Sequence, residues 1–264
     1  MAQQQSDTPP AATALDAIVL AAGKGTRMNS DLPKVLHEVA GEPMVKWVIA
    51  AARQAGADRI IVVVGYRSQL VREALADQPG VEFVEQTEQL GTGHAVQMAE
   101  PLYRGVAGRD VLVLAGDMPL LRGSTLVKLL ARHRAQSAAA SVATGELEDP
   151  AGYGRIVRDA AGAFERIVEH KDATDAQRAI REVNPSCYCF DSARLFEALA
   201  QVDSNNSQGE FYVTDVLGIL REAGHTVIAV NAVGPDEVEG INSPEQLARV
   251  DQTLRQRQDE GAAP

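Results

Sequence analysis

The chain has 264 residues, of which 45% are hydrophobic and 23% charged, and its formal net charge at pH 7 is -11. This composition supports a core for one large or two small globular domains. The negative charge argues against nonspecific binding to nucleic acid or to an anionic membrane, because both require a basic surface. A polyphosphate ligand would therefore need a local group of cations, or a divalent metal.

Residues 1–14 contain neither the basic segment nor the apolar segment of a secretory signal peptide, and we expect them to form a disordered tail. No apolar run approaches the ~20 residues of a membrane span, so no membrane association is expected. Cys187 and Cys189 stand two apart in a strand-like run, which places their side chains on one face and disfavours a disulfide bond. These features predict a cytoplasmic protein.

A glycine-rich turn at Gly23 and Gly25 follows the first apolar run. Glycine has no Cβ, so such a turn can take a positive φ and point several N–H groups at one anion, while Lys24, Arg27 and Lys34 supply positive charge nearby. The dinucleotide fingerprint and the P-loop both require other glycine spacings. The alternative is an ordinary tight turn whose basic side chains are simply solvated.

The next residues alternate between helix and strand patterns. Apolar residues at helical spacing predict a helix that begins at Pro43 and ends before Gly56, and further patterns predict a strand over 60–64, a short helix over 69–76 and a strand over 81–84. Alternation of this kind predicts a parallel sheet with crossover helices.

A polar segment over residues 85–94 precedes a helix predicted over 95–103. The amide side chains of Gln86 and Gln89 carry both a donor and an acceptor, as is needed to read the edge of a nucleotide base, and Gly91 and Gly93 are expected to expose backbone groups beside them. An ordinary polar loop with Thr92 as the helix N-cap explains the same residues equally well.

Gly116-Asp117 follows the apolar strand predicted over 111–114. Open α/β sheets bind ligands at the carboxyl ends of their strands, and a carboxylate there suits Mg²⁺, which takes one or two protein oxygens and completes its shell with phosphate and water. The alternative is a carboxylate that only caps a helix.

In the second half the pattern changes from alternation to paired strands, which predicts a smaller, more antiparallel lobe for a second substrate. The predicted elements are a helix over 124–135, a strand over 138–144, a hairpin of 152–158 with 164–169, a strand over 183–190, a helix ending near 223, a strand over 226–230 and a helix over 243–258. The predicted fold class is α/β, a Rossmann-like and mostly parallel sheet flanked by helices, with an antiparallel lobe. The expected divisions are a nucleotidyltransferase domain over 15–242, with a nucleotide lobe at about 15–145 and a sugar lobe at about 146–225, and a C-terminal helix and tail over 243–264.

Several motifs together resemble one family. They are residues 20–28 with Pro33-Lys34, residues 86–94, Gly116-Asp117, residues 152–156, 169–172, 212–215 and 239–242. Over about residues 16–255 the chain is similar to the N-terminal pyrophosphorylase domain of bacterial bifunctional N-acetylglucosamine-1-phosphate uridylyltransferases. No hexapeptide repeats follow, so we expect no β-helix acetyltransferase domain; that domain makes the trimer in the family, so we expect a monomer.

The resemblance implies a role for individual residues. The residues expected at the uridine nucleotide are Ala22, Gly23, Gln86, Gln89, Gly91 and Thr92. The residues expected to be catalytic, on the triphosphate, are Arg27 and Lys34, and those expected to bind Mg²⁺ are Asp117 and Asn242. The residues expected around the amino sugar are Gly154, Glu169, Asn184, Tyr212 and Thr214.

The implied reaction is Mg²⁺-dependent transfer of UMP from UTP to N-acetylglucosamine-1-phosphate by direct in-line attack, giving UDP-N-acetylglucosamine and pyrophosphate. Two positions depart from the family pattern: Ala115 replaces a tyrosine, and Asn184-Pro185-Ser186, which the resemblance places near the sugar, replaces Asn-Thr/Ser-Gly. The alternatives are a nucleotidyltransferase for another sugar-1-phosphate or nucleotide, and a non-catalytic nucleotide-sensing module of the same fold.

Overall fold

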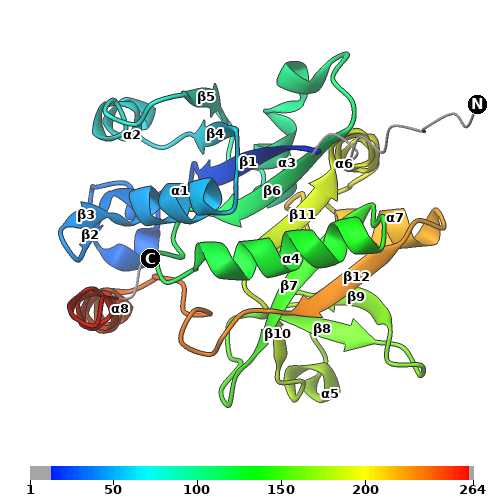
Figure 1. Cartoon of the computed structure of the whole chain (residues 1–264). Coiled ribbons are helices and arrows are strands. Elements are labelled where there is room, and N and C mark those ends of the chain that lie inside the picture. Colours follow the sequence, from blue (N-terminus) through cyan, green and yellow to red (C-terminus); the bar gives the residue numbers. More distant parts are fainter. Residues whose placement is uncertain (1–12, 262–264) are drawn as a thin grey trace, which may run out of the picture.

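The computed structural model describes residues 13–261, so nearly all of the predicted tail over 1–14 lies outside the described residues. Its central feature is a sheet in the order β5-β4-β1-β6-β11-β7-β10-β8-β9, with β12 paired to β7 (Figure 1). The strands of this sheet are β1 (Ala14–Ala21), β4 (Arg59–Val64), β5 (Val81–Glu85), β6 (Arg109–Ala115), β7 (Ala140–Glu146), β8 (Gly154–Arg158), β9 (Phe164–Val168), β10 (Glu182–Asn184), β11 (Cys187–Asp191) and β12 (Val227–Asn231). A separate hairpin consists of β2 (Glu38–Val39) and β3 (Glu42–Pro43).

Helices connect and cover these strands. The α-helices are α1 (Met44–Gln54), α2 (Ser68–Ala74), α3 (Thr92–Gln97), α4 (Gly123–Ala135), α5 (Asp175–Arg178), α6 (Ser192–Leu199), α7 (Asp215–Glu222) and α8 (Pro244–Asp259). The short 3₁₀ helices are η1 (Thr26–Met28), η2 (Lys34–Leu36) and η3 (Glu100–Tyr103). Within residues 13–261 no helix combines the length and the apolar character needed to cross a membrane.

The predicted fold class is confirmed. Strands β5, β4, β1 and β6 pair in parallel, β11 lies antiparallel between β6 and β7, and β8 and β9 form the predicted antiparallel hairpin. Because β1 and β6 run in parallel, their carboxyl ends meet at one edge of the sheet, where the glycine turn and Gly116-Asp117 both lie.

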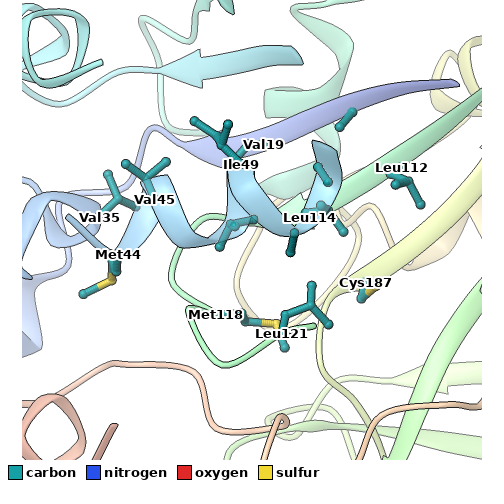
Figure 2. Close-up of a cluster of buried hydrophobic side chains, with 14 of the residues drawn as sticks. Val19, Val35, Met44, Val45, Ile49, Leu112, Leu114, Met118, Leu121 and Cys187 are labelled. Atoms are coloured by element: carbon teal, nitrogen blue, oxygen red, sulfur yellow. The ribbon is translucent and has the colours of Figure 1, made fainter. Parts of the chain in front are cut away.

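The core lies on both faces of the sheet, as continuous apolar strands require. On one face, Val19 of β1 and Leu112 of β6 pack with Ile49 of α1, and Figure 2 shows this cluster. On the other face, Ile18 and Val113 pack with residues of α3, α6 and α7. Figure 1 shows α1 and α4 together on the first face. Both cysteines are free and buried in the first cluster, which agrees with the prediction that they share a face and form no disulfide.

The prediction of one strand over residues 183–190 is wrong. The chain forms two strands instead, because Pro185 interrupts the pairing and Ser186 adopts a left-handed φ of 60°. The first strand, β10, pairs with β7 and β8, and the second, β11, pairs with β6 and β7. The interruption therefore transfers the chain from the hairpin end of the sheet to its centre.

The helix predicted over residues 95–103 is also wrong in extent. It divides into α3, which already begins at Thr92, and η3, which has Pro101 in its first turn. Proline lacks the N–H that an uninterrupted helix would use, which accounts for the division. The sequence interpretation did not include α6, whose first residue Ser192 follows an Asp191 N-cap.

Candidate active site

A cavity of about 500 Å³ opens at the carboxyl ends of β1 and β6. Its lining contains every residue that the family resemblance pointed to, namely Ala22, Gly23, Arg27, Lys34, Gln86, Gln89, Gly91, Thr92, Asp117, Gly154, Glu169, Asn184, Tyr212, Thr214 and Asn242. The fold thus brings together segments that are far apart in the sequence. The chemical role of each residue remains a prediction.

Four of these side chains form one hydrogen-bonded group. The Lys34 ammonium group donates to Asp117 Oδ2 and, at 3.0 Å, to Asn242 Oδ1. Arg27 Nη2 donates to the same Asn242 oxygen at 2.8 Å. The backbone N–H of Ile241 donates to the Asp117 carbonyl at 3.0 Å, which holds the segment carrying Asn242 beside Asp117.

The glycine turn positions Lys34 through close packing rather than through two left-handed residues. Gly25 has a φ of 66°, and a Cβ on it would lie 2.5 Å from Lys34 Cβ, so only glycine fits there. Gly23 is not among the described residues with a positive φ, which corrects the expectation for it. Lys24 is also not part of the cavity lining: its Nζ lies 5.3 Å from the centre of the Tyr66 ring.

The oxygens of Asp117 and Asn242 fit a divalent cation that is also bound by phosphate. Both accept hydrogen bonds from one Lys34 ammonium group, so they converge on a single point. Mg²⁺ is usually held by one or two carboxylates together with substrate phosphates and water, rather than by a cage of protein ligands. Residues 13–261 contain no cluster of three or more His, Cys, Asp or Glu side chains able to hold a metal.

The amide groups on the nucleotide side are oriented by the protein. Gln86 is buried, and its Nε2 donates to the Gly91 carbonyl at 3.0 Å and lies 3.1 Å from His94 Nδ1. Gln89 Nε2 donates to the Ala22 carbonyl at 3.0 Å. Because both hydrogens of the Gln86 amide nitrogen are directed at protein acceptors, this residue offers its Oε1 as an acceptor to a ligand.

The glycines of residues 91–93 allow two loops to approach each other. A Cβ on Gly91 would lie 2.5 Å from the Phe211 carbonyl oxygen, and the Gly93 N–H donates to that oxygen at 2.7 Å. Gly93 is therefore buried and bonded to protein, which corrects the expectation that it exposes a backbone group to a ligand. Gly91 is the N-cap of α3, and the Thr92 hydroxyl instead accepts the N–H of Val213 at 3.1 Å.

Glu169 places a carboxylate in the wall of the cavity. Burial raises the pKa of Glu169, and the nearby carboxylates of Asp215, Asp172 and Glu210 raise it further, while a hydrogen bond from Thr214 Oγ1 at 3.2 Å lowers it. A Cβ on Gly154 would lie 3.4 Å from Glu169 Oε2, so the absent side chain leaves space beside this oxygen. A hydroxyl-bearing ligand in that space would add hydrogen bonds to a poorly solvated carboxylate.

The Asn184 side chain is held by its own neighbours. Its Oδ1 accepts the Ser186 N–H at 3.0 Å, and its Nδ2 donates to the Tyr188 hydroxyl at 2.7 Å. Pro185 and Ser186 also line the cavity. Each amide hydrogen bond to protein reduces what Asn184 can offer to a sugar, so the segment over residues 184–186 determines the shape of this wall as well as its hydrogen bonding.

Residues 17–215 match the MobA-like NTP transferase domain family. The chain belongs to this family. It is 48% identical over 241 residues to the bifunctional protein GlmU of Streptococcus gordonii, 91% of this chain and 52% of that protein, and 47% identical over 241 residues to GlmU of Pelobacter propionicus, again 91% and 52%. The GlmU of Brevibacillus brevis is 49% identical over 243 residues, 92% of this chain and 52% of that protein.

The chain spans about half the length of these curated relatives. The resemblance predicted from the motifs is confirmed by them. Among solved structures, that of UDP-glucose pyrophosphorylase complexed with UDP-glucose has a TM-score of 0.75 at 18% identity and covers 92% of this chain and 99% of its own. At that identity the likeness supports the fold alone.

Two cavity residues in this member of the family were missed from sequence. The Tyr153 hydroxyl lies 3.4 Å from both the Val238 carbonyl oxygen and the Gly240 nitrogen, so it ties the loop before β8 to the segment that carries Asn242. Gln208 Nε2 donates to the Tyr212 hydroxyl at 2.7 Å, and Gln208 Oε1 accepts from Lys171. A tyrosine between two glycines was the available signal for the first residue; the polar loop around Gln208 carries no comparable signal.

Proposed function

We propose that this chain catalyses Mg²⁺-dependent transfer of UMP from UTP to N-acetylglucosamine-1-phosphate, yielding UDP-N-acetylglucosamine and pyrophosphate. The observation that carries the proposal is the hydrogen-bonded group of Arg27, Lys34, Asp117 and Asn242, which lines the same cavity as Gln86, Gln89 and Glu169. The similarity to GlmU proteins over nearly the whole chain supports the same activity. Buried free cysteines fit the reducing cytoplasm, where we place the reaction.

On the nucleotide side, the orientation of Gln86 favours uracil over cytosine. Its amide nitrogen is directed at Gly91 and His94, which leaves Oε1 as the group for a ligand. Uracil has an N–H at position 3 that donates to such an oxygen, whereas the corresponding nitrogen of cytosine is an acceptor. A site that leaves a buried polar group unpaired discriminates strongly against the wrong ligand.

At the phosphates, the chain supplies charge and alignment rather than a nucleophile. A phosphate oxygen of the sugar-1-phosphate attacks the α-phosphorus of UTP; the new P–O bond forms while the bond to the β-phosphate oxygen breaks, and the electron pair leaves with pyrophosphate. Arg27 and Lys34 face the charge that develops on the transferred group and on the leaving group. Burial raises the pKa of Cys187, and neither cysteine lines the cavity, so thiolate chemistry takes no part.

The residues that would hold Mg²⁺ are Asp117 and Asn242. When bound, the ion supplies electrostatic stabilisation of the phosphates and helps to align them. Asp117 and Asn242 keep their oxygens converged through the hydrogen bond from Ile241 to the Asp117 carbonyl.

On the sugar side, Glu169 and Thr214 present a carboxylate and a hydroxyl, as hydroxyl and acetamido groups require. The departures at Pro185 and Ser186 lie in the wall of the same cavity, so a different sugar-1-phosphate is the main alternative. A nucleotide-sensing module is the second alternative; it would need the loop that carries Gln86 and Gln89 but not the hydrogen-bonded group of Arg27, Lys34, Asp117 and Asn242.

A pyrophosphate-release assay over pairs of nucleotide and sugar-1-phosphate tests the proposal. UTP with N-acetylglucosamine-1-phosphate should give the highest kcat/KM, with CTP and glucose-1-phosphate below it. A different preferred sugar would refute the substrate assignment while leaving nucleotidyl transfer intact. Absence of pyrophosphate release with every pair, together with saturable UTP binding, would establish the sensing module instead.

A further inference from the structure

Lys34 occupies the point at which the two candidate metal-binding oxygens meet. Its ammonium group is bonded to Asp117 and, at 3.0 Å, to Asn242 Oδ1. The same asparagine oxygen also accepts from Arg27 Nη2 at 2.8 Å. Both oxygens thus already carry cationic hydrogen bonds in the protein alone.

A divalent ion and the Lys34 ammonium group cannot both remain on these oxygens. The Lys34 and Asp117 side chains are only 18% and 17% exposed, so water screens the repulsion between two cations there poorly. Binding of the ion therefore requires the lysine tip to leave.

A bound phosphate would give the displaced ammonium group a new anionic partner. Its stem is fixed, because a Cβ on Gly25 would stand 2.5 Å from Lys34 Cβ, so the tip can turn within the cavity while the stem stays packed on the glycine turn. A triphosphate in that cavity would offer anionic oxygens in exchange for Asp117. Without nucleotide, displacement of Lys34 breaks its ion pair with Asp117 and no phosphate replaces that partner.

We propose that Lys34 acts as a tethered substitute for the divalent cation, which makes the free enzyme bind metal weakly and couples metal binding to nucleotide binding. This inference rests on the proposed nucleotidyltransferase function, and it adds a role for Lys34 before any chemistry takes place. Removal of the lysine charge should strengthen metal binding by the free protein even though it weakens phosphate binding.

The test is titration of Mn²⁺ into the nucleotide-free chain, with free Mn²⁺ followed by electron paramagnetic resonance. Lys34→Met keeps the stem and removes the charge, and it should lower the Kd for Mn²⁺ by at least about tenfold, since a partly buried like charge at contact distance costs more than that factor. The matched control is Lys24→Met, which removes the same charge from the same turn but at a side chain over Tyr66; its Kd should stay close to that of the unmodified chain. Adding Asp117→Ala to Lys34→Met should abolish the gain.

Equal Kd values for the unmodified chain and Lys34→Met would overturn the proposal, as would a gain that survives Asp117→Ala or that Lys24→Met reproduces. A thermal melt identifies a variant that does not fold, and Lys34→Gln then replaces it. Because the titration contains no substrate, it is independent of turnover. Pyrophosphate release by the unmodified chain with unchanged Mn²⁺ affinity in Lys34→Met would refute the inference alone, whereas the absence of any release would refute the proposed function.

Discussion

Replacement of Gly91 by alanine tests how the loop over residues 85–94 is attached to the segment around Phe211. Gly91 has φ 112° and ψ 176°, a region that is essentially restricted to glycine and costs another residue of order 1–3 kcal/mol. A Cβ there would also stand 2.5 Å from the Phe211 carbonyl oxygen and 2.8 Å from the Phe211 nitrogen, and both are backbone atoms that cannot rotate away. Overpacking of that kind costs about 1–3 kcal/mol.

Together these terms predict that Gly91→Ala lowers the free energy of unfolding by about 2–6 kcal/mol. Since 1 kcal/mol shifts Tm by roughly 2–4 °C in a protein of this size, Tm should fall by at least about 4 °C. Urea unfolding provides the free energy of unfolding. The transition can be followed by the fluorescence of Trp47, the single tryptophan of the chain, which lies partly buried on α1.

Alanine substitutions at two further glycines separate the cost of the steric contact from the cost of the backbone strain. Gly93→Ala places a Cβ 3.0 Å from the same Phe211 oxygen without a positive φ, so it measures the contact. Gly105→Ala has φ 74° and nothing within 4 Å of its Cβ, so it measures the backbone strain, about 1–2 kcal/mol. A loss below about 1 kcal/mol in Gly91→Ala, or a loss no greater than that of Gly105→Ala, would refute the proposed attachment.

Four other outcomes are expected. Lys34→Ala and Arg27→Ala should each lower kcat for uridylyl transfer by more than about tenfold, or ~1.4 kcal/mol, because each removes a charge that faces the transferring phosphate; near-normal rates in both would contradict their role. Asp117→Asn should raise the Mg²⁺ concentration for half-maximal rate, and Asn242→Ala should act in the same direction; a rate insensitive to chelator would exclude the metal role. Burial raises the pKa of Asp215 from 3.8 to about 6, and the nearby carboxylates of Asp203 and Asp172 add to this rise. Because the folded protein holds this proton more tightly than the unfolded chain, the free energy of unfolding falls as the pH rises from about 4 to about 6. The Tm of Asp215→Asn should therefore exceed that of the unmodified chain above pH 6 but not near pH 4. Finally, Pro185→Thr with Ser186→Gly should increase the preference for N-acetylglucosamine-1-phosphate over glucose-1-phosphate by about two- to tenfold in kcat/KM, as expected for one regained hydrogen bond.

The last two outcomes have clear contrary results. An equal Tm difference between Asp215→Asn and the unmodified chain at both pH values would show that the carboxyl group does not titrate as inferred. An unchanged substrate ratio in the double variant would show that residues 185 and 186 do not contact the sugar, although they line the cavity.

The sequence by itself determined the order of most helices and strands, and it pointed to residues that the fold brings into one cavity. Continuous apolar runs such as residues 60–64 are interpretable because a strand covered on both faces requires apolar residues at every position. Glycines and carboxylates at strand ends are informative for a similar reason, since parallel strands bring their carboxyl ends to one edge. The site residues themselves came from a family resemblance, which the comparisons confirm.

Only the tertiary structure decided which partners these residues have. Lys24 and Lys34 have the same chemistry and stand ten positions apart, yet one lies over Tyr66 and the other binds Asp117. Likewise, the sequence predicts that Gly93 exposes its backbone to a ligand, but its N–H donates to the carbonyl oxygen of Phe211, which is far along the chain. Local propensity depends on neighbours within a few residues, whereas hydrogen bonds and close contacts depend on where distant segments meet, and that information enters only when the sheet has formed.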